Sequence, residues 1–134
     1  MSARNGDKAR YHRQRKNKLA RRERMYNGAH PLPPLAGRTA ILVDDGLATG
    51  STMRAAVQAV RRNEPTAVIV AVPVGAADTC ASLRREADAV LCLQSPEPFH
   101  AVGLWYDRFD QTSDEEVRAL LDAARKGTHQ TARD

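Results

Sequence analysis

Hydrophobic residues follow two alternating patterns along the middle of the chain. Three continuous apolar runs, at 41–43, 66–74 and 89–93, are typical of strands buried on both faces of a parallel sheet. Between them, residues 52–63 and 77–87 place apolar side chains three and four positions apart, which indicates amphipathic helices. The order strand, helix, strand, helix, strand predicts right-handed crossovers and a parallel sheet, an α/β fold.

Further elements are predicted on both sides of this alternation. Residues 19–26 carry a narrow apolar stripe at helical spacing, which predicts a helix that docks on the sheet. Asn27-Gly28 ends this helix, and a proline-rich connector over 31–34 leads to the sheet. Near the other end, Ser113 and Glu116 have the spacing of a capping box and predict the start of a last helix.

The segment after the first strand combines an acidic pair with a loop of small residues. Asp44 and Asp45 fall at the carboxyl end of the strand, where parallel sheets bind their ligands. The following loop has nothing larger than Leu47, so backbone amides remain accessible to an anion. Ser51 or Thr52 is expected to cap a helix that begins one or two residues later, whose N-terminus favours negative charge. These parts predict a sugar-phosphate site.

The thirteen residues from Ala40 to Thr52 resemble the ribose-5-phosphate signature of the type I phosphoribosyltransferases. This family moves ribose 5-phosphate from phosphoribosyl pyrophosphate (PRPP) to a nitrogenous base, on a parallel Rossmann-like sheet. The resemblance implies that Asp44 and Asp45 hold the ribose hydroxyls and are the catalytic candidates. It also implies that a loop wraps the 5′-phosphate: Ala48, Thr49, Gly50, Ser51 and Thr52. The cofactor implied is Mg²⁺, which travels mainly with the pyrophosphate.

Two other interpretations of the acidic segment remain open. It can be a strand followed by an Asp-Gly turn and a capped helix, without a ligand. Paired carboxylates also suit a magnesium ion held by protein side chains, although sugar binding ranks above this. The chain has no Gly-x-x-x-x-Gly-Lys loop and no Gly-x-Gly-x-x-Gly after a strand, so kinases, NTPases and dinucleotide enzymes lack their usual support.

Residues 95–106 form a prolyl loop with an aromatic end, similar to the late loop of purine-type phosphoribosyltransferases. The resemblance makes three aromatic side chains candidates for stacking on the base: Phe99, Trp105 and Tyr106. It likewise makes Asp107 or Arg108 a candidate for facing the magnesium pyrophosphate, with Asp107 as the metal ligand. Core packing is the alternative for each aromatic residue. The sequence supplies no evident nucleophile or general base, and the transfer does not require one.

Length and charge suggest one domain with a basic start. A chain of 134 residues, 42% of them hydrophobic, suits a single core. Residues 1–24 contain ten Lys and Arg but only two acidic residues. Because the whole chain has a net charge of +5, the remaining residues carry a net charge of about −3. We expect a basic tail at 1–18, disordered or a frayed helix, a partial phosphoribosyltransferase-like domain at 19–126, and a C-terminal tail at 127–134. The tail can bind nucleic acid, but a solvated tail is preferred because stacking aromatics are few.

The cysteines and the hydropathy pattern favour a cytoplasmic protein. Cys80 and Cys92 fall within apolar patterns and are expected to be reduced and buried. No run approaches about 18 apolar residues and the start is charged, so neither a signal peptide nor a membrane span is predicted.

The start of the chain differs from the family pattern. Members normally have another strand, a helix and a pyrophosphate loop before the signature, whereas only about forty residues precede it here. We therefore expect an N-terminally shortened member whose sheet is incomplete on that side. Its unpaired edge and apolar surface favour self-association as a homo-oligomer, and its activity is expected to be weak or lost.

Three functions follow from these expectations. The first is a phosphoribosyltransferase acting on PRPP and a nitrogenous base. The second is a non-catalytic PRPP-sensing regulator that uses the basic tail on nucleic acid. The third is a structural half-domain completed by another copy. The sequence leaves the acceptor base open.

Overall fold

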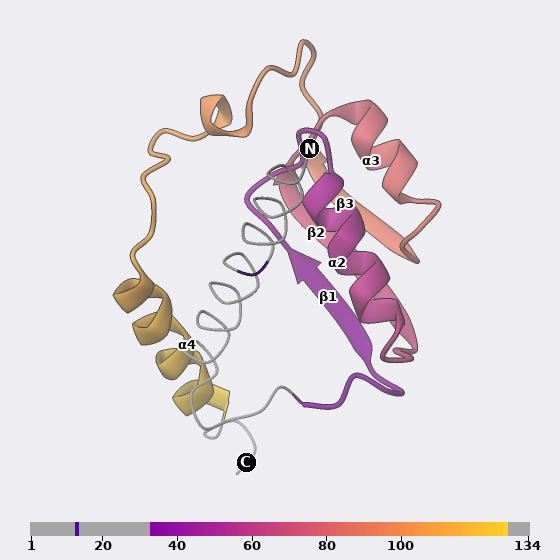
Figure 1. Ribbon diagram of the computed structural model, residues 1–134. Coiled ribbons are helices and arrows are strands. Elements are labelled where there is room, and N and C mark those ends of the chain that lie inside the picture. The colour runs from indigo at the N-terminus through magenta and orange to yellow at the C-terminus, as the bar shows by residue number, and fades with distance from the viewer. Residues whose placement is uncertain (1–12, 14–32, 129–134) are drawn as a thin grey trace, which may run out of the picture. The chain divides into compact units, whose positions relative to one another are not determined.

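The computed structural model describes residue 13 and residues 33–128 (Figure 1). The described residues belong to two compact units, Pro33–Phe109 and the C-terminal part from Asp110 onward. The predicted N-terminal helix at 19–26 and most of the basic tail lie outside the described residues.

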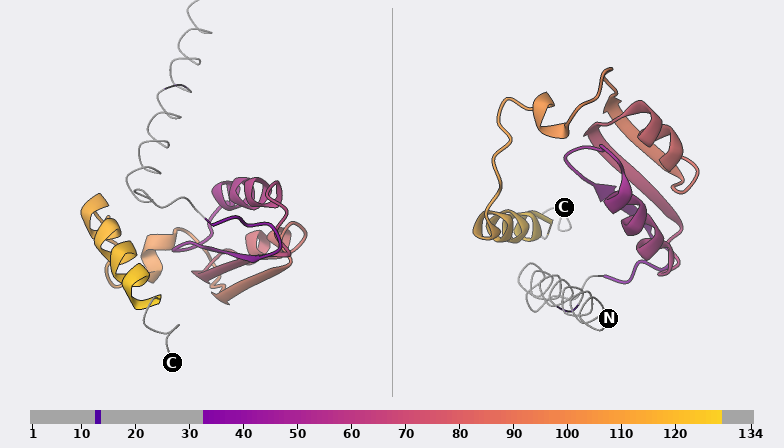
Figure 2. Two further views of the ribbon diagram at one scale, coloured as in Figure 1. Left: turned by 90° about the horizontal axis from the view of Figure 1, so that it is seen from below. Right: turned by 45° about the horizontal axis from the view of Figure 1, so that its top comes forward.

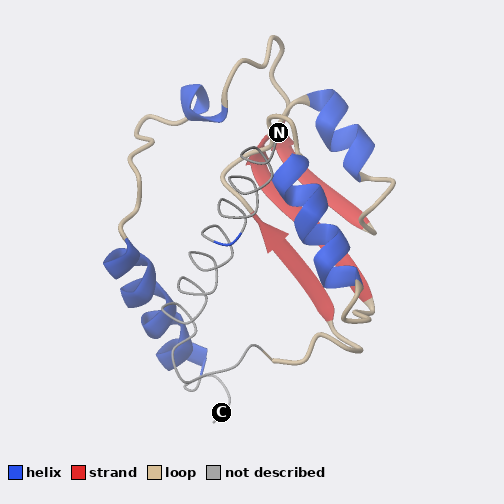
Figure 3. Cartoon of the chain, in the orientation of Figure 1, coloured by secondary structure: helices blue, strands red, loops and turns tan. Residues whose placement is uncertain are grey.

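The unit Pro33–Phe109 is built on a parallel sheet whose strands follow the order β1-β2-β3 (Figure 3). The strands and the helices that join them are β1 (Thr39–Val43), α2 (Ser51–Arg61), β2 (Ala67–Val74), α3 (Ala77–Leu83) and β3 (Ala89–Gln94). In the register, Thr39 lies beside Ala67, and Ile69 lies beside Ala89. The prediction of alternating strands and helices in a parallel α/β fold is confirmed.

Helices α2 and α3 cover one face of this sheet (Figures 1 and 2). Alternate side chains of β2 point to that face, and Val68, Val70, Val72 and Val74 are at most 4% exposed. Val68, Val70 and Val72 pack in a core that also holds Leu47, Met53, Val57 and Leu83. Each buried side chain of this size stabilises the fold by about 1.5–3 kcal/mol relative to an exposed one.

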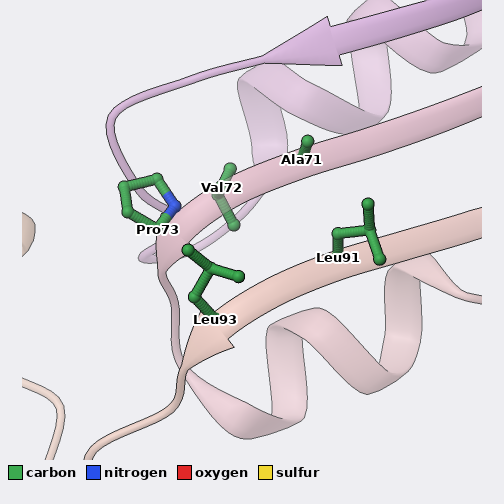
Figure 4. A pocket seen from close by; sticks show the side chains of 5 residues that line it. All are labelled: Ala71, Val72, Pro73, Leu91 and Leu93. Carbon is green, nitrogen blue, oxygen red and sulfur yellow. The ribbon is translucent and has the colours of Figure 1, made fainter.

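No element of the unit Pro33–Phe109 covers the opposite face of the sheet, which we call the open face. Ile41, Val43, Leu91 and Leu93 lie there and are 57–80% exposed. Figure 4 shows a shallow hollow on this face, lined by Ala71, Val72, Pro73, Leu91 and Leu93. The prediction that the strands are buried on both faces is therefore wrong for this unit. Three strands in sequential order, joined by two crossovers of the same hand, place both helices on one side.

Helix α3 ends at Leu83, four residues before the predicted end. The chain then turns toward β3, and the Asp88 carboxylate fastens this turn to the start of β2. Asp88 Oδ2 accepts a hydrogen bond from the Val68 N–H at 2.7 Å and lies 2.9 Å from Arg61 Nη1. These bonds hold the pKa of Asp88 below its ordinary value, the Val68 N–H being the larger cause.

The C-terminal unit contains helix α4 (Asp114–Thr128), which runs two residues past the predicted domain end at 126. Its predicted capping box is confirmed: Glu116 N donates to Ser113 Oγ at 3.2 Å, and Ser113 N donates to Glu116 Oε2 at 2.8 Å. The Ser113 N–H, followed by the Ser113 side chain, lowers the pKa of the Glu116 carboxyl. Two orphan amides of the helix start are thereby satisfied.

Both cysteines are free thiols, as predicted, with Cys80 buried and Cys92 half-buried. Burial, and then the neighbouring Cys92, raise the pKa of the Cys80 thiol to about 11. Such a thiol stays protonated at neutral pH, which suits a packing role. Across the described ranges, no helix combines the length and apolar character that a membrane crossing requires.

Candidate functional site

The acidic pair directly follows β1, at the carboxyl end of the sheet. Asp44 and Asp45 are both exposed, and the Asp45 N–H donates to Asp44 Oδ1 at 2.9 Å. Within the described ranges, neither carboxylate forms an ion pair. Desolvation, and then the charge of Asp44, raise the pKa of Asp45. Because neither carboxylate is paired within the described ranges, its oxygen lone pairs can accept hydrogen bonds from hydroxyl groups.

The loop after the acidic pair is fastened to the ends of the other strands. Leu47 N donates to Val74 O at 3.0 Å, and Ala76 N donates to Leu47 O at 2.9 Å. Gly75 N in turn donates to Gln94 O at 3.1 Å, which links the ends of β2 and β3. The side chain of Leu47 is only 2% exposed, so it anchors the loop in the core. The ends of all three strands thus fix the position of the acidic pair and the loop.

Helix α2 begins without a side-chain cap. Gly50 occupies the N-cap position with a φ of 74°, and no side chain caps the helix that begins at Ser51. The prediction that Ser51 or Thr52 caps a helix starting near Met53 is wrong. The reason is a contact with a distant segment, because a Cβ at position 50 would lie 2.6 Å from the Thr79 methyl group. Glycine has no Cβ and also adopts the left-handed conformation readily. Among the described residues, the Ser51 N–H has only a long contact to Thr49 Oγ1, at 3.5 Å, and no side chain of the N-cap residue accepts from the first turn. The start of α2 is therefore open to an anion.

A hollow of about 180 Å³ brings the acidic turn and the helix start together. Its lining comprises Asp44, Gly46, Leu47, Ala48, Thr49, Gly50, Ser51, Thr52, Met53 and Val102. Every residue of the predicted phosphate loop lies in this lining, together with the first carboxylate; Asp45 is adjacent in sequence but does not line it. Thr49 Oγ1 and Ser51 Oγ lie 3.3 Å apart and add hydroxyl groups to the amides. The arrangement offers donors for a phosphate beside acceptors for a sugar.

The late loop closes one wall of this hollow. The short 3-10 helix η1 (Val102–Trp105) places Val102 against the acidic turn, where a Cβ on Gly46 would lie 2.6 Å from Val102 Cγ1. The sequence patterns did not single out Val102, because its partner is more than fifty residues away. Glycine at position 46 is what allows this close approach.

Tyr106 and Trp105, which were predicted to stack on the base, differ from each other in their contacts. The Tyr106 hydroxyl donates to the backbone carbonyl of Asp45, and the Tyr106 ring packs on Phe109 at 5.2 Å between centroids. Desolvation, followed by the charges of Asp45 and Asp44, raises the pKa of Tyr106. Trp105 is 44% exposed, and neither Trp105 nor Tyr106 lines the hollow. Tyr106 thus contacts the acidic turn through its hydroxyl group.

The described residues provide few protein ligands for a metal ion. Asp107, the predicted metal ligand, is exposed. Over the described ranges, no three His, Cys, Asp or Glu side chains gather as a metal site requires. The adjacent carboxylates of Asp44 and Asp45 fit a Mg²⁺ ion only if oxygens of the bound substrate complete its coordination.

The fold and the hollow together define a class of protein. A parallel α/β unit with two exposed carboxylates and a helix start without a side-chain cap at its strand ends has the architecture of a domain that takes its ligand at this edge of the sheet. Residues 5–106 match the model of the phosphoribosyl transferase domain. The chain belongs to this family.

Individual relatives agree with the family model. Two proteins of Mycobacterium tuberculosis, each named "Putative phosphoribosyl transferase", are 45% identical to this chain over 108 residues: MT0597 of strain CDC 1551 / Oshkosh and Rv0571c of strain ATCC 25618 / H37Rv. The alignment covers 81% of this chain and 24% of each relative. The chain therefore spans about a quarter of the length of these relatives.

A solved structure shares the fold. The crystal structure of TT1426 from Thermus thermophilus superposes with a TM-score of 0.75 at 37% sequence identity. The match covers 84% of this chain and 54% of that one. The α/β architecture is thus the same in both.

Proposed function

We propose that the hollow binds the ribose 5-phosphate part of PRPP and that the protein transfers this group to a nitrogenous base. One observation carries the proposal: the unpaired Asp44 carboxylate and the uncapped start of α2 line the same hollow. A phosphorylated sugar needs both kinds of group, acceptors for its hydroxyls and donors for its phosphate. The family to which the chain belongs gives the same direction.

The residues of the hollow suit the steps of such a transfer. The 5′-phosphate would accept hydrogen bonds from the loop amides and hydroxyls, each worth about 1.5–3 kcal/mol when charge-assisted. The ribose hydroxyls would donate to Asp44 and Asp45, which fixes the orientation of the ring. The C1′–O bond to pyrophosphate then breaks as the base nitrogen forms its bond to C1′. Nearby carboxylates stabilise the positive charge that develops on the sugar.

Binding without turnover is the second candidate function. Among the described residues, neither Lys nor Arg lines the hollow, so no side chain there would neutralise the leaving pyrophosphate. A site of this kind would hold PRPP without turning it over, as a PRPP-sensing regulator does. Incubation with radiolabelled PRPP and a panel of bases separates the two functions, because only a transferase releases labelled nucleotide.

Calorimetric titration with ribose 5-phosphate tests the binding proposal directly. The double variant Asp44→Asn, Asp45→Asn should weaken ribose 5-phosphate binding by about tenfold or more, since charge-assisted bonds are lost. Inorganic phosphate should still bind, because its donors are unchanged. Glu115→Gln on α4 removes an exposed carboxylate from the other unit and is the control. Unchanged affinity in the double variant would remove the assignment of the acidic pair.

A further inference from the structure

The backbone carbonyls of the phosphate loop are held by two side chains that do not line the hollow. Thr79 Oγ1 in α3 donates to Ala48 O at 2.7 Å, and Arg54 Nη1 in α2 donates to Thr49 O at 3.1 Å. The family signature at 40–52 includes neither Thr79 nor Arg54. Two successive carbonyl oxygens of the loop are therefore fixed by side chains of two different helices, α3 and α2.

Arg54 is itself held in place by α3 and the turn that follows it. Its Nε lies 3.2 Å from Glu86 Oε1, and a guanidinium nitrogen contacts Ser82 Oγ. Ser82 Oγ donates in turn to Thr79 O at 2.9 Å. Arg54 and Thr79, which bind the two loop carbonyls, therefore belong to one hydrogen-bond network. About a third of the Arg54 side chain is exposed, and its charge is paired with Glu86. These contacts fix the orientation of its planar guanidinium group.

The orientation of these carbonyls determines where the neighbouring amides point. In a trans peptide, the C=O of one residue and the N–H of the next point in opposite directions. Holding Ala48 O toward Thr79 therefore turns the Thr49 N–H away from Thr79. Holding Thr49 O toward the Arg54 guanidinium turns the Gly50 N–H away from that group. Among the described residues, no acceptor takes either of these two amides. Both residues line the hollow.

We propose that Thr79 and Arg54 are positioning residues for the anion-binding loop, which turn two carbonyl dipoles away from the hollow and two amide donors toward a phosphate. The inference rests on the proposed function, because the anion it serves is the 5′-phosphate of the sugar. It also accounts for the tight fit between the Thr79 methyl and Gly50, which sets the distance between loop and helix. Neither side chain needs to contact the substrate.

Paired substitutions at position 79 separate the hydroxyl from the shape of the side chain. Thr79→Val keeps the methyl group against Gly50 but removes the donor, while Thr79→Ser keeps the donor. In the full chain, Thr79→Val should weaken ribose 5-phosphate binding in calorimetry by about tenfold, the value of one organising hydrogen bond. Thr79→Ser should bind within about threefold of the natural chain, a change of less than 1 kcal/mol. Equal affinity of the valine variant, or failure of serine to restore it, would overturn the proposal.

Arg54 has a matched control on the same helix. Arg61 also pairs with a carboxylate and donates to a backbone carbonyl, that of Glu86, but it does not contact the loop. Arg54→Lys should lower ribose 5-phosphate affinity, whereas Arg61→Lys should leave it unchanged even if both lower the melting temperature. Equal losses of affinity in the two variants would show that the effect is only structural and would contradict the inference.

Amide NMR shifts of the ligand-free protein keep this inference distinct from the proposed function. The Thr49 and Gly50 amide signals should move in Thr79→Val and stay near their original positions in Thr79→Ser. If the natural chain binds neither ribose 5-phosphate nor inorganic phosphate, the proposed function fails, and these shifts alone decide whether the carbonyls are held. Unmoved shifts in Thr79→Val would overturn the positioning role whatever the binding result.

Discussion

The two faces of the sheet differ strongly in how exposed their side chains are, although both carry aliphatic residues. Valines 68, 70, 72 and 74 on the helix-covered face are at most 4% exposed, whereas Ile41, Val43, Leu91 and Leu93 on the open face are 57–80% exposed. Both sets are aliphatic, although the covered valines lie on β2 and the exposed residues lie on β1 and β3. The difference teaches that hydrophobicity alone does not locate the core, because the side on which the crossovers pass decides which face is covered.

The candidate site depends on the covered face. Leu47 anchors the loop in that core, and the residues that hold the loop carbonyls belong to α2 and α3. The open face contributes none of the residues that line the site hollow. Substitutions on the two faces should therefore have separable effects on folding, association and binding.

The largest effect is expected from Leu83→Ala on the covered face. Leu83 is fully buried, so its truncation should lower the free energy of unfolding by about 2–5 kcal/mol, including the cavity it leaves. Leu91→Ala on the open face is the control and, at protein concentrations low enough to keep the chain monomeric, should change stability by about 0.5 kcal/mol or less. Urea denaturation followed by circular dichroism measures both. Similar losses in the two variants would show that the open face is buried in solution.

A second prediction concerns what the open face does in solution. Self-association, expected from the sequence, would remove this apolar surface and its shallow hollow from water (Figure 4). The double variant Leu91→Glu, Leu93→Glu should then shift the chain from an oligomer toward a monomer, because like charges would face each other across the contact. Sizing chromatography with light scattering measures the shift. A natural chain that is already monomeric at micromolar concentration would contradict self-association.

The sequence predicted those features that depend on neighbouring residues. Apolar runs and helical spacing located the three strands, the helices between them and the capping box at Ser113, because each of these is a local pattern. The acidic pair and its loop were found for the same reason. Their positions relative to β1 follow from chain order, since a ligand loop comes directly after its strand.

The features that the sequence missed depend on contacts between distant segments. The left-handed Gly50 is explained by Thr79, and the wall of the hollow is completed by Val102 against Gly46. The Tyr106 hydroxyl reaches the Asp45 carbonyl across sixty-one positions. None of these pairs has a periodic signal, so only the folded arrangement reveals them. The open face was missed because strand composition does not state which side the helices cover.

A third prediction tests whether the late loop supports the acidic turn. Tyr106→Phe removes the hydroxyl bond to the Asp45 carbonyl but keeps the ring packed on Phe109. The loss of one hydrogen bond of about 1 kcal/mol should weaken ribose 5-phosphate binding by a few-fold. Trp105→Phe, at an exposed position that does not line the hollow, is the control. A larger loss in the Trp105 variant would instead show that Trp105 supports the ribose 5-phosphate site more than the Tyr106 hydroxyl does.

The smallest expected effect comes from Asp88, at the border of the covered face. Its carboxylate accepts from Val68 N and pairs with Arg61, and these bonds lower its pKa in the folded protein. Its contribution to stability is therefore fully present above the ordinary carboxyl pKa near 4 and is lost as the pH falls through the lower folded value. Asp88→Asn keeps an acceptor for Val68 but removes the charge, so its stability deficit should be constant near neutral pH and shrink in acid. Asp78→Asn, an exposed carboxylate of α3, is the control for removing a charge. Thermal unfolding between about pH 2 and 7 measures the difference, and a deficit that does not shrink below the pKa near 4 would show that Asp88 acts through its shape rather than its charge.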